Sequence, residues 1–168
     1  MATEPNERFL ILMRHAKSDW SDESLSDHDR PLNPRGRNAA PRMAGWLAEI
    51  GIVPDLILSS SSVRTRETVS LMSDQWGEEA QVSYSESLYL ASPETILSMV
   101  RSDACGAERL MVVAHNPGMA HLASVLSQQS LDMPTAAIAI FELGELDWLD
   151  LQPGSTLGLV HYMRPKAL

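Results

Sequence analysis

The sequence predicts an α/β fold in which helices cover both faces of a central sheet. Short apolar runs alternate along the chain with amphipathic stretches of helical length. The runs at 9–13, 56–58 and 110–114 are too short for helices and apolar throughout, as in strands buried on both faces. With 168 residues, 44% of them hydrophobic, the chain is the size of one compact domain. We therefore expect a single domain over 1–168 with these three runs as central strands.

Three helix starts are marked in the sequence by a polar residue followed by proline. Asparagine or serine can accept a hydrogen bond from a free amide of the first turn, and proline at the first helical position loses no bond. We expect helices that begin at Asn33-Pro34, Ser92-Pro93 and Asn116-Pro117 and end near Ile50, Arg101 and Ser127; Gly51 stops the first of them. A serine after the run at 56–58 is expected to cap a further helix, with Arg64 in its first turn.

Two later segments, 136–143 and 156–163, have the composition of strands and are joined through a polar turn. Their closeness in sequence favours antiparallel pairing, whereas strands separated by a helix pair in parallel. The sheet is therefore predicted to be mixed and mostly parallel.

Composition and charge exclude several function classes. The chain has 22 acidic and 13 basic residues and a net charge of −9, which opposes attraction to nucleic acid or to an anionic membrane. Cys105 is the single cysteine, so neither an intrachain disulfide nor a cysteine-based zinc site can form. The polar opening has no signal-peptide pattern, and no apolar stretch approaches the ~20 residues of a membrane span. We expect a soluble, cytoplasmic protein.

Polar clusters follow each of the three predicted central strands. Arg14 and His15 follow the first strand, Arg64 the second, and His115 the third. Ligands of open α/β sheets bind beyond the carboxyl ends of the strands, so these side chains are expected to meet in one crevice. Arginine forks and free helix amides bind anionic oxygens. The pattern therefore predicts a site for a dianion, most simply a phosphoryl group.

These residues lie in motifs that resemble the histidine phosphatase superfamily. The motifs are Arg14-His15-Ala16, SSSVRTRET at 60–68 and AHNPG at 114–118. The chain most closely resembles the SixA branch of small phosphohistidine phosphatases, because of its short length, DRPLNPRG at 29–36 and HNPG at 115–118. The resemblance covers about 9–163 and implies a phosphoglycerate mutase-like fold, a three-layer α/β/α sandwich with a mostly parallel, mixed sheet.

The resemblance also implies a mechanism and a set of site residues. His15 would be the nucleophile and form a phosphohistidine intermediate that water hydrolyses. Arg14, Arg64 and His115 would bind the nonbridging oxygens of the phosphoryl group. No metal ion or other cofactor is expected, because no zinc-binding motif or closely spaced His/Asp cluster occurs. Further candidates for binding phosphate or substrate are Lys17, Ser18, Asn116 and Gly118. Asn116 would either hold His115 or cap the following helix.

The general acid is the point where this sequence departs from the family. Larger members carry a glutamate in a Leu-x-Glu context, and in this sequence Leu90 stands in its place. Glu86 is the candidate replacement, and water or Asp19 could serve an ester substrate. A phosphoramidate such as phosphohistidine has a labile P–N bond and an imidazole leaving group that can arrive protonated, so it needs an enzyme acid less. The missing glutamate therefore favours phosphohistidine.

Four functions follow as alternatives. The leading one is a metal-independent phosphatase acting on phosphohistidine in a protein, such as a histidine phosphotransfer protein. The others are a small-molecule phosphomonoesterase, a phosphomutase, and a noncatalytic phosphate-binding module. The short chain disfavours a mutase, and the complete set of charged motif residues disfavours a binding module. Trp20 could line the substrate cleft, while Arg66 is expected to make a surface ion pair with a carboxylate, because positions i and i+2 face apart on a helix.

Overall fold

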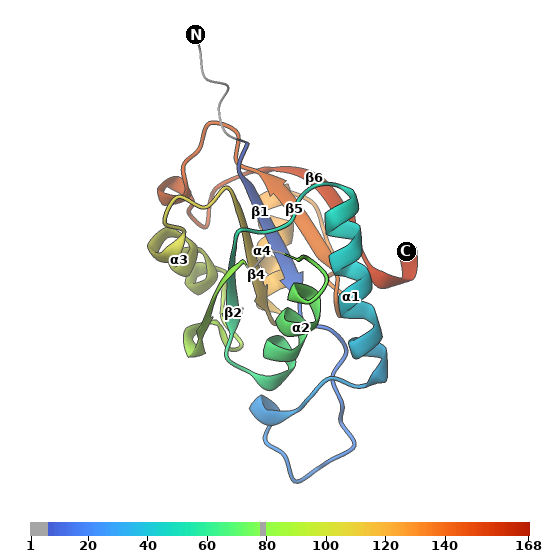
Figure 1. Ribbon diagram of the computed structural model, residues 1–168. Helices are drawn as coiled ribbons and strands as arrows, with labels where there is room; N and C mark the ends of the chain where they lie inside the picture. The colour runs from blue at the N-terminus through green and yellow to red at the C-terminus, as the bar shows by residue number, and fades with distance from the viewer. Residues whose placement is uncertain (1–6, 78–79) are drawn as a thin grey trace.

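The computed structural model describes residues 7–77 and 80–168, which form an α/β fold around a six-stranded sheet (Figure 1). The strand order is β3-β2-β4-β1-β5-β6. The strands are β1 (Phe9–Arg14), β2 (Leu56–Ser60), β3 (Gln81–Ser85), β4 (Arg109–Ala114), β5 (Ile138–Glu142) and β6 (Gly158–Met163). The three strands predicted to be central, β1, β2 and β4, lie in the middle of the sheet.

The sheet is mixed, as the sequence predicts. Strands β1 to β4 pair in parallel, whereas β5 runs antiparallel to both β1 and β6. The edge strand β3, which sequence reasoning missed, reads QVSYS and is largely exposed. It has no apolar pattern because it lies at the rim of the sheet, where pairing with β2 rather than burial holds it in place.

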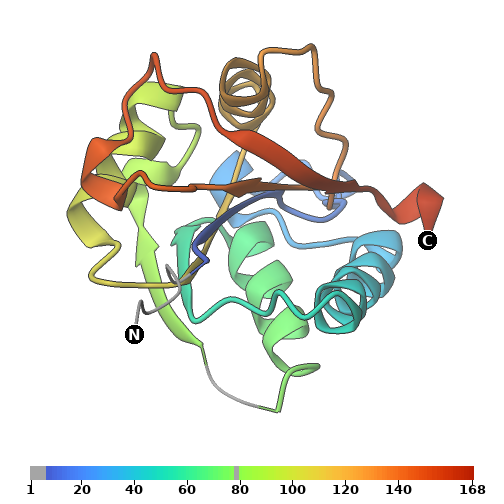
Figure 2. The same ribbon diagram turned by 90° about the horizontal axis from the view of Figure 1, so that it is seen from above.

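Two helices cover each face of the sheet, which confirms the predicted three layers. Helices α1 (Pro34–Glu49) and α2 (Val63–Ser73) lie on one face, and α3 (Pro93–Asp103) and α4 (Gly118–Ser127) on the other (Figure 2). A hydrophobic core lies on each face of the sheet, and alternate residues of β1 pack into one or the other. Ile11 packs in the α1/α2 layer and Leu12 in the α3/α4 layer. Within the described ranges, no helix has both the length and the apolar character needed to cross a bilayer.

The predicted helix caps are present and fix where each helix begins. Asn33, Ser62 and Ser92 each accept a hydrogen bond from the backbone amide three residues later, at Gly36, Thr65 and Thr95. The N-cap position of α4 is Pro117, and Asn116, one residue before it, accepts through Oδ1 from the amide of Ala120 in the first turn at 3.1 Å. Of the two roles expected for Asn116, the structure shows the capping role.

Two glycines allow helix starts to pack directly against the loops that carry the site. A Cβ on Gly36, at the start of α1, would lie 2.2 Å from the carbonyl oxygen of Lys17. A Cβ on Gly118, at the start of α4, would lie 2.0 Å from the carbonyl oxygen of Ala91. Since backbone atoms cannot yield to such contacts, any larger residue would push these helices away from the carboxyl end of the sheet.

Candidate active site

The carboxyl end of the parallel strands gathers the four side chains that the motifs single out. Arg14 ends β1 and His15 follows it, Arg64 lies in the first turn of α2, and His115 follows β4. The Nε of Arg64 lies 3.3 Å from Nε2 of His15, and its Nη2 lies 3.3 Å from Nδ1 of His115. The two imidazole centroids are 5.2 Å apart. These groups line one pocket of about 250 Å³, so segments far apart in sequence converge as predicted.

His15 is held in one tautomer with a free nitrogen facing Arg64. Its Nδ1 lies 2.7 Å from the carbonyl oxygen of Ala16, which can only accept a hydrogen bond, so Nδ1 carries the proton. The Nε2 atom therefore keeps its lone pair and accepts from Arg64. Burial, together with the positive charge of Arg64 and Arg14, lowers the pKa of His15 to about 3. At neutral pH the ring is uncharged and has the form that a nucleophile needs.

His115 is fixed in the opposite tautomer. Because Arg64 can only donate, Nδ1 of His115 accepts, and its Nε2 donates to the hydroxyl of Ser60 at 2.7 Å. Burial and the neighbouring Arg64 lower the pKa of His115 to about 3. The neutral ring thus helps to orient the guanidinium of Arg64 between the two histidines. Nothing in the sequence distinguishes Ser60 from the other serines of the run at 59–62, so its contact with His115 was not predicted.

Arg14 lines the pocket and has one unused side-chain donor. Its Nη1 donates to the carbonyl oxygen of Met133 at 3.3 Å, while its Nε is buried and has no hydrogen-bond partner among the described residues. Burial and the charge of Arg64 lower the pKa of Arg14. An unsatisfied buried N–H beside a second arginine is costly in the absence of an anion, and an anionic oxygen in the pocket would satisfy it.

Asp27 is a site residue that sequence reasoning missed. The loop after β1 folds back over the pocket, and the carboxylate of Asp27 accepts from Arg64 at 3.0 Å, from Arg30 at 2.7 Å and from the hydroxyl of Tyr89. Its carbonyl oxygen accepts from Arg64 at 2.6 Å. Although partial burial opposes ionisation, the bonds from Tyr89 and Arg64 lower the pKa of Asp27 to about 2. Asp27 is therefore an anion at neutral pH and has no proton to give.

The long loop that carries Asp27 is pinned at the rim of the pocket. Arg30 donates from Nε to the carbonyl oxygen of Asp19 at 3.1 Å and from Nη2 to the hydroxyl of Ser18. The ring of Trp20 stacks on the same guanidinium, whose central carbon lies 3.2 Å from the ring centroid. Ser18 and Trp20, both candidates from the sequence, line the pocket; Ser18 is buried, whereas Trp20 is 70% exposed. Arg30 lines the pocket as well and was not among the residues expected there.

The remaining predicted residues are placed differently. Lys17 and Asn116 line the pocket, and Leu90, which is 56% exposed, stands at its rim. Glu86 is exposed and lies outside the lining, at the start of a 3-10 turn after β3. Gly118 is buried against Ala91 and also lies outside the lining, because its role in the fold is the close contact described above.

The expected ion pair of Arg66 is absent from the described part of the chain. Its Nε donates to the carbonyl oxygen of Ser61 at 2.9 Å, and its guanidinium lies over the ring of Tyr84 at 4.2 Å. The prediction of a carboxylate partner was wrong because the strand β3, unseen in the sequence, brings an aromatic ring to that face of α2.

The model of the histidine phosphatase superfamily (branch 1) matches residues 10–88, which carry Arg14, His15 and Arg64. An uncharacterized chloroplastic protein of Arabidopsis thaliana is 37% identical over 158 residues, covering 84% of this chain and 69% of the relative. An uncharacterized protein of Mycobacterium tuberculosis is 35% identical over 153 residues, covering 84% of this chain and 93% of the relative. The chain belongs to the histidine phosphatase superfamily.

Within that superfamily the chain falls in the SixA-like branch. A solved structure from Nakamurella multipartitia, assigned as a phosphohistidine phosphatase SixA, is 29% identical and superposes with a TM-score of 0.81. The match covers 96% of this chain and 98% of that one. Membership and site geometry together support phosphatase activity for this histidine phosphatase. In the described ranges, no three His, Cys, Asp or Glu side chains gather where they could hold a metal ion.

Proposed function

We propose that this histidine phosphatase removes the phosphoryl group from phosphohistidine in a protein, through a phosphorylated His15 and without a metal ion. The observation that carries the proposal is the neutral Nε2 of His15, 3.3 Å from Arg64 and held in its tautomer by Ala16. A neutral ring nitrogen among fixed cationic donors is the arrangement required for in-line attack on phosphorus.

In the first step, Nε2 of His15 attacks phosphorus, a P–Nε2 bond forms and the bond to the leaving nitrogen breaks. Arg64 transfers its hydrogen bond from Nε2 to the incoming phosphoryl group, the freed lone pair of Nε2 becomes the new bond, and Nδ1 keeps its proton, bonded to the carbonyl oxygen of Ala16. Arg64 and the free Nε of Arg14 donate to the nonbridging oxygens and stabilise the charge that spreads over them. The departing imidazole leaves as a neutral group with the proton it carried into the site.

In the second step, water attacks phosphorus, a P–O bond forms and the P–Nε2 bond breaks. Its electron pair returns to Nε2, so His15 is again neutral with the proton on Nδ1, and inorganic phosphate leaves with both protons of the water. The choice of a P–N substrate is supported by what lines the pocket. Asp27 is the carboxylate among the lining residues, and its pKa of about 2 prevents it from protonating an alkoxide. Leu90 lines the pocket and stands at the sequence position where larger members of the family carry a glutamate.

A protein substrate is supported by the rim of the pocket. Trp20 and Leu90 are large apolar side chains that are 70% and 56% exposed, and both line the opening. Exposed apolar groups around a polar pocket are typical of contact surfaces for macromolecules. The assignment of the similar Nakamurella protein as a phosphohistidine phosphatase agrees with this choice.

The experiment is to compare turnover of a phosphorylated histidine phosphotransfer domain with turnover of p-nitrophenyl phosphate and sugar phosphates, with and without EDTA. We expect the phosphodomain to be preferred, no inhibition by EDTA, and an acid-labile, base-stable phosphate on His15. His15→Ala should abolish both labelling and turnover. His121→Ala is the matched control, because His121 is an exposed histidine on α4 outside the pocket lining, and it should retain the wild-type rate.

Each other outcome identifies a different function. A large preference for small esters would make the chain a phosphomonoesterase, and accumulation of a bisphosphorylated product would make it a mutase. A wild-type rate in His15→Ala would remove the proposed nucleophile. Binding of phosphate without any turnover would leave a noncatalytic module.

A further inference from the structure

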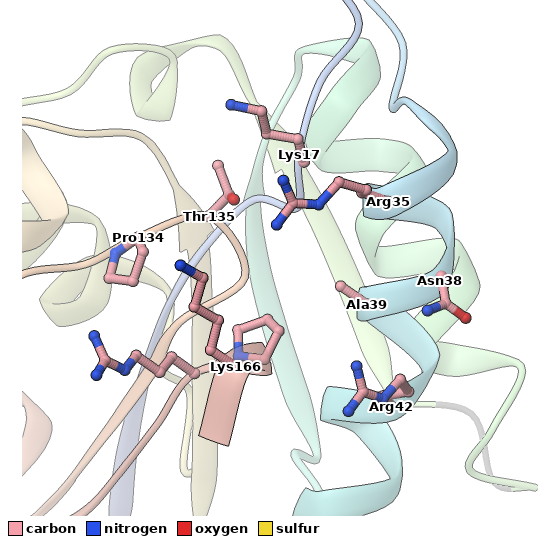
Figure 3. A pocket seen from close by; sticks show the side chains of 10 residues that line it. Lys17, Arg35, Asn38, Ala39, Arg42, Pro134, Thr135 and Lys166 are labelled. Atoms are coloured by element: carbon pink, nitrogen blue, oxygen red, sulfur yellow. The ribbon is translucent and has the colours of Figure 1, made fainter. Parts of the chain in front are cut away.

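A second pocket, next to the active site, is lined by basic side chains (Figure 3). Its volume is about 320 Å³, and it lies between α1, the loop after β1, the segment before β5 and the end of the described chain. We call it the cationic trough and define it by its five basic residues, Lys17, Arg35, Arg42, Arg164 and Lys166. In Figure 3, Arg35 and Arg42 extend from α1 toward the side on which Lys166 lies.

The trough concentrates positive charge in an acidic chain. It holds five of the 13 basic residues of a chain whose net charge is −9, and none of the described carboxylate side chains lines it. Four of these cations, Lys17, Arg35, Arg164 and Lys166, make no side-chain hydrogen bond or ion pair within 7–77 and 80–168. The fifth, Arg42, donates to the main-chain oxygen of Leu168 at 3.1 Å. Unpaired like charges around one hollow repel one another, and an anionic ligand relieves that repulsion.

The trough continues into the active site. Lys17 and Thr135 line both pockets, and Lys17 follows His15 by two residues. A further hollow of about 330 Å³, whose lining includes one carboxylate, Asp132, shares Arg164 with the trough and Arg14 and Asn116 with the catalytic pocket. A ligand whose phosphoryl group reaches His15 therefore has the trough directly beside it.

The trough cations differ from those that hold the phosphoryl group. Arg64 is 3% exposed and is fixed by bonds to two histidines and Asp27, as a site for one defined phosphate requires. The five trough cations are all exposed and are not held in place by carboxylates. Exposed cations suit a broad acidic surface, because such a surface needs attraction and orientation rather than fixed geometry.

We propose that the cationic trough docks an acidic segment of the phosphorylated protein substrate and so orients its phosphohistidine toward His15. The proposal rests on the proposed function for the identity of the substrate, but the docking itself is a binding event and can be measured without turnover.

The test uses two short fluorescein-labelled peptides, one rich in glutamate and the other with glutamine at the same positions. Binding to the wild type is followed by fluorescence anisotropy. We expect the glutamate peptide to bind at least about tenfold more tightly at ~20 mM NaCl, and the advantage to shrink toward nothing at ~300 mM, because salt screens exposed charges. The double variant Arg35→Glu with Lys166→Glu should weaken glutamate-peptide binding at least about tenfold.

The single variant Arg35→Glu has a matched control in Arg8→Glu, which also reverses one charge but does so at the amino end of β1. Arg8 pairs with exposed Asp147 at 3.2 Å and lies at the edge of the sheet opposite the site. Arg8→Glu should leave peptide binding unchanged. A thermal melt checks that each variant folds, and Arg35→Gln with Lys166→Gln replaces the double variant if charge reversal prevents folding.

Three results would overturn the docking proposal: equal binding of the two peptides by the wild type, full binding by the folded double variant, or a trough specific for small phosphates. The third would appear as tripolyphosphate that binds far more tightly than the glutamate peptide and is lost in the double variant. Failure of the proposed function looks different. The chain would then bind the glutamate peptide through the trough and yet leave a phosphorylated histidine phosphotransfer domain intact.

Discussion

Replacing Arg64 by lysine separates the charge of this residue from its geometry. The guanidinium donates four hydrogen bonds, to His15, to His115 and twice to Asp27, and so spans the pocket in one plane. Lysine keeps the positive charge, but its ammonium is a single point that cannot lie between both imidazoles, reach Asp27 and still present a donor to the phosphoryl group. We expect Arg64→Lys to fold and to lose most of its activity.

The size of the loss follows from the bonds that lysine cannot make. A hydrogen bond to a charged group contributes about 1.5–3 kcal/mol, and a lysine that is not held by both imidazoles and Asp27 loses at least the value of one well-placed bond to the phosphoryl group. A loss of about 2–3 kcal/mol of transition-state stabilisation corresponds to a fall of roughly 30- to 160-fold in kcat/KM. Arg64→Ala, which also removes the charge, should lose more.

The assay is steady-state turnover of p-nitrophenyl phosphate and of a phosphorylated histidine phosphotransfer domain at pH 7. Arg66→Lys is the matched control, because Arg66 lies on the same helix but contacts Ser61 and Tyr84 instead of the pocket. It should stay within about twofold of the wild type. If Arg64→Lys remained within about threefold, charge alone would account for Arg64, and the importance of its planar fork would be refuted.

Three further predictions concern pH, charge and packing. Because the pKa values of His15 and His115 are about 3 in the folded state, the unfolded chain binds more protons between pH 6.5 and 3, and the free energy of unfolding should fall as pH drops through that window. In urea titrations, the free energy of unfolding of His115→Gln should fall less steeply with decreasing pH than that of the wild type, with a slope smaller by up to about 1.4 kcal/mol per pH unit. Equal slopes for the two proteins would contradict the buried neutral ring. Asp27→Asn keeps an oxygen for Arg64 and Tyr89 but removes the anion that competes with phosphate. Its inhibition constant for inorganic phosphate should therefore fall about threefold or more, and an unchanged or higher constant would count against competition. Gly118→Ala places a Cβ 2.0 Å from the oxygen of Ala91 and should cost about 1–3 kcal/mol or more in urea unfolding, whereas Gly45→Ala, in open space on α1, should be neutral or stabilising; equal stabilities would disprove the close contact.

The sequence predicted the residues at the floor of the site because they are tied to the ends of buried strands. Arg14, His15 and His115 directly follow apolar runs, and Arg64 follows a capping serine by two residues. Parallel strands place their carboxyl ends at one edge, so the convergence of these groups follows from the order of elements alone. The edge strand β3 was not predictable in this way, because pairing rather than apolar burial defines it.

The sequence by itself thus determined the α/β fold, the helix caps and which charged groups meet at the strand ends. Only the tertiary structure decided which imidazole nitrogen of His15 is unprotonated, that the carboxylate of Asp27 is hydrogen-bonded to Arg64, and that Glu86 lies outside the pocket. It also decided that cations from α1 and from the end of the described chain form one trough beside the site. The physical reason is range: caps and apolar periodicity act between near neighbours, whereas tautomers, loop contacts and charge clusters depend on atoms that approach only after the chain has packed.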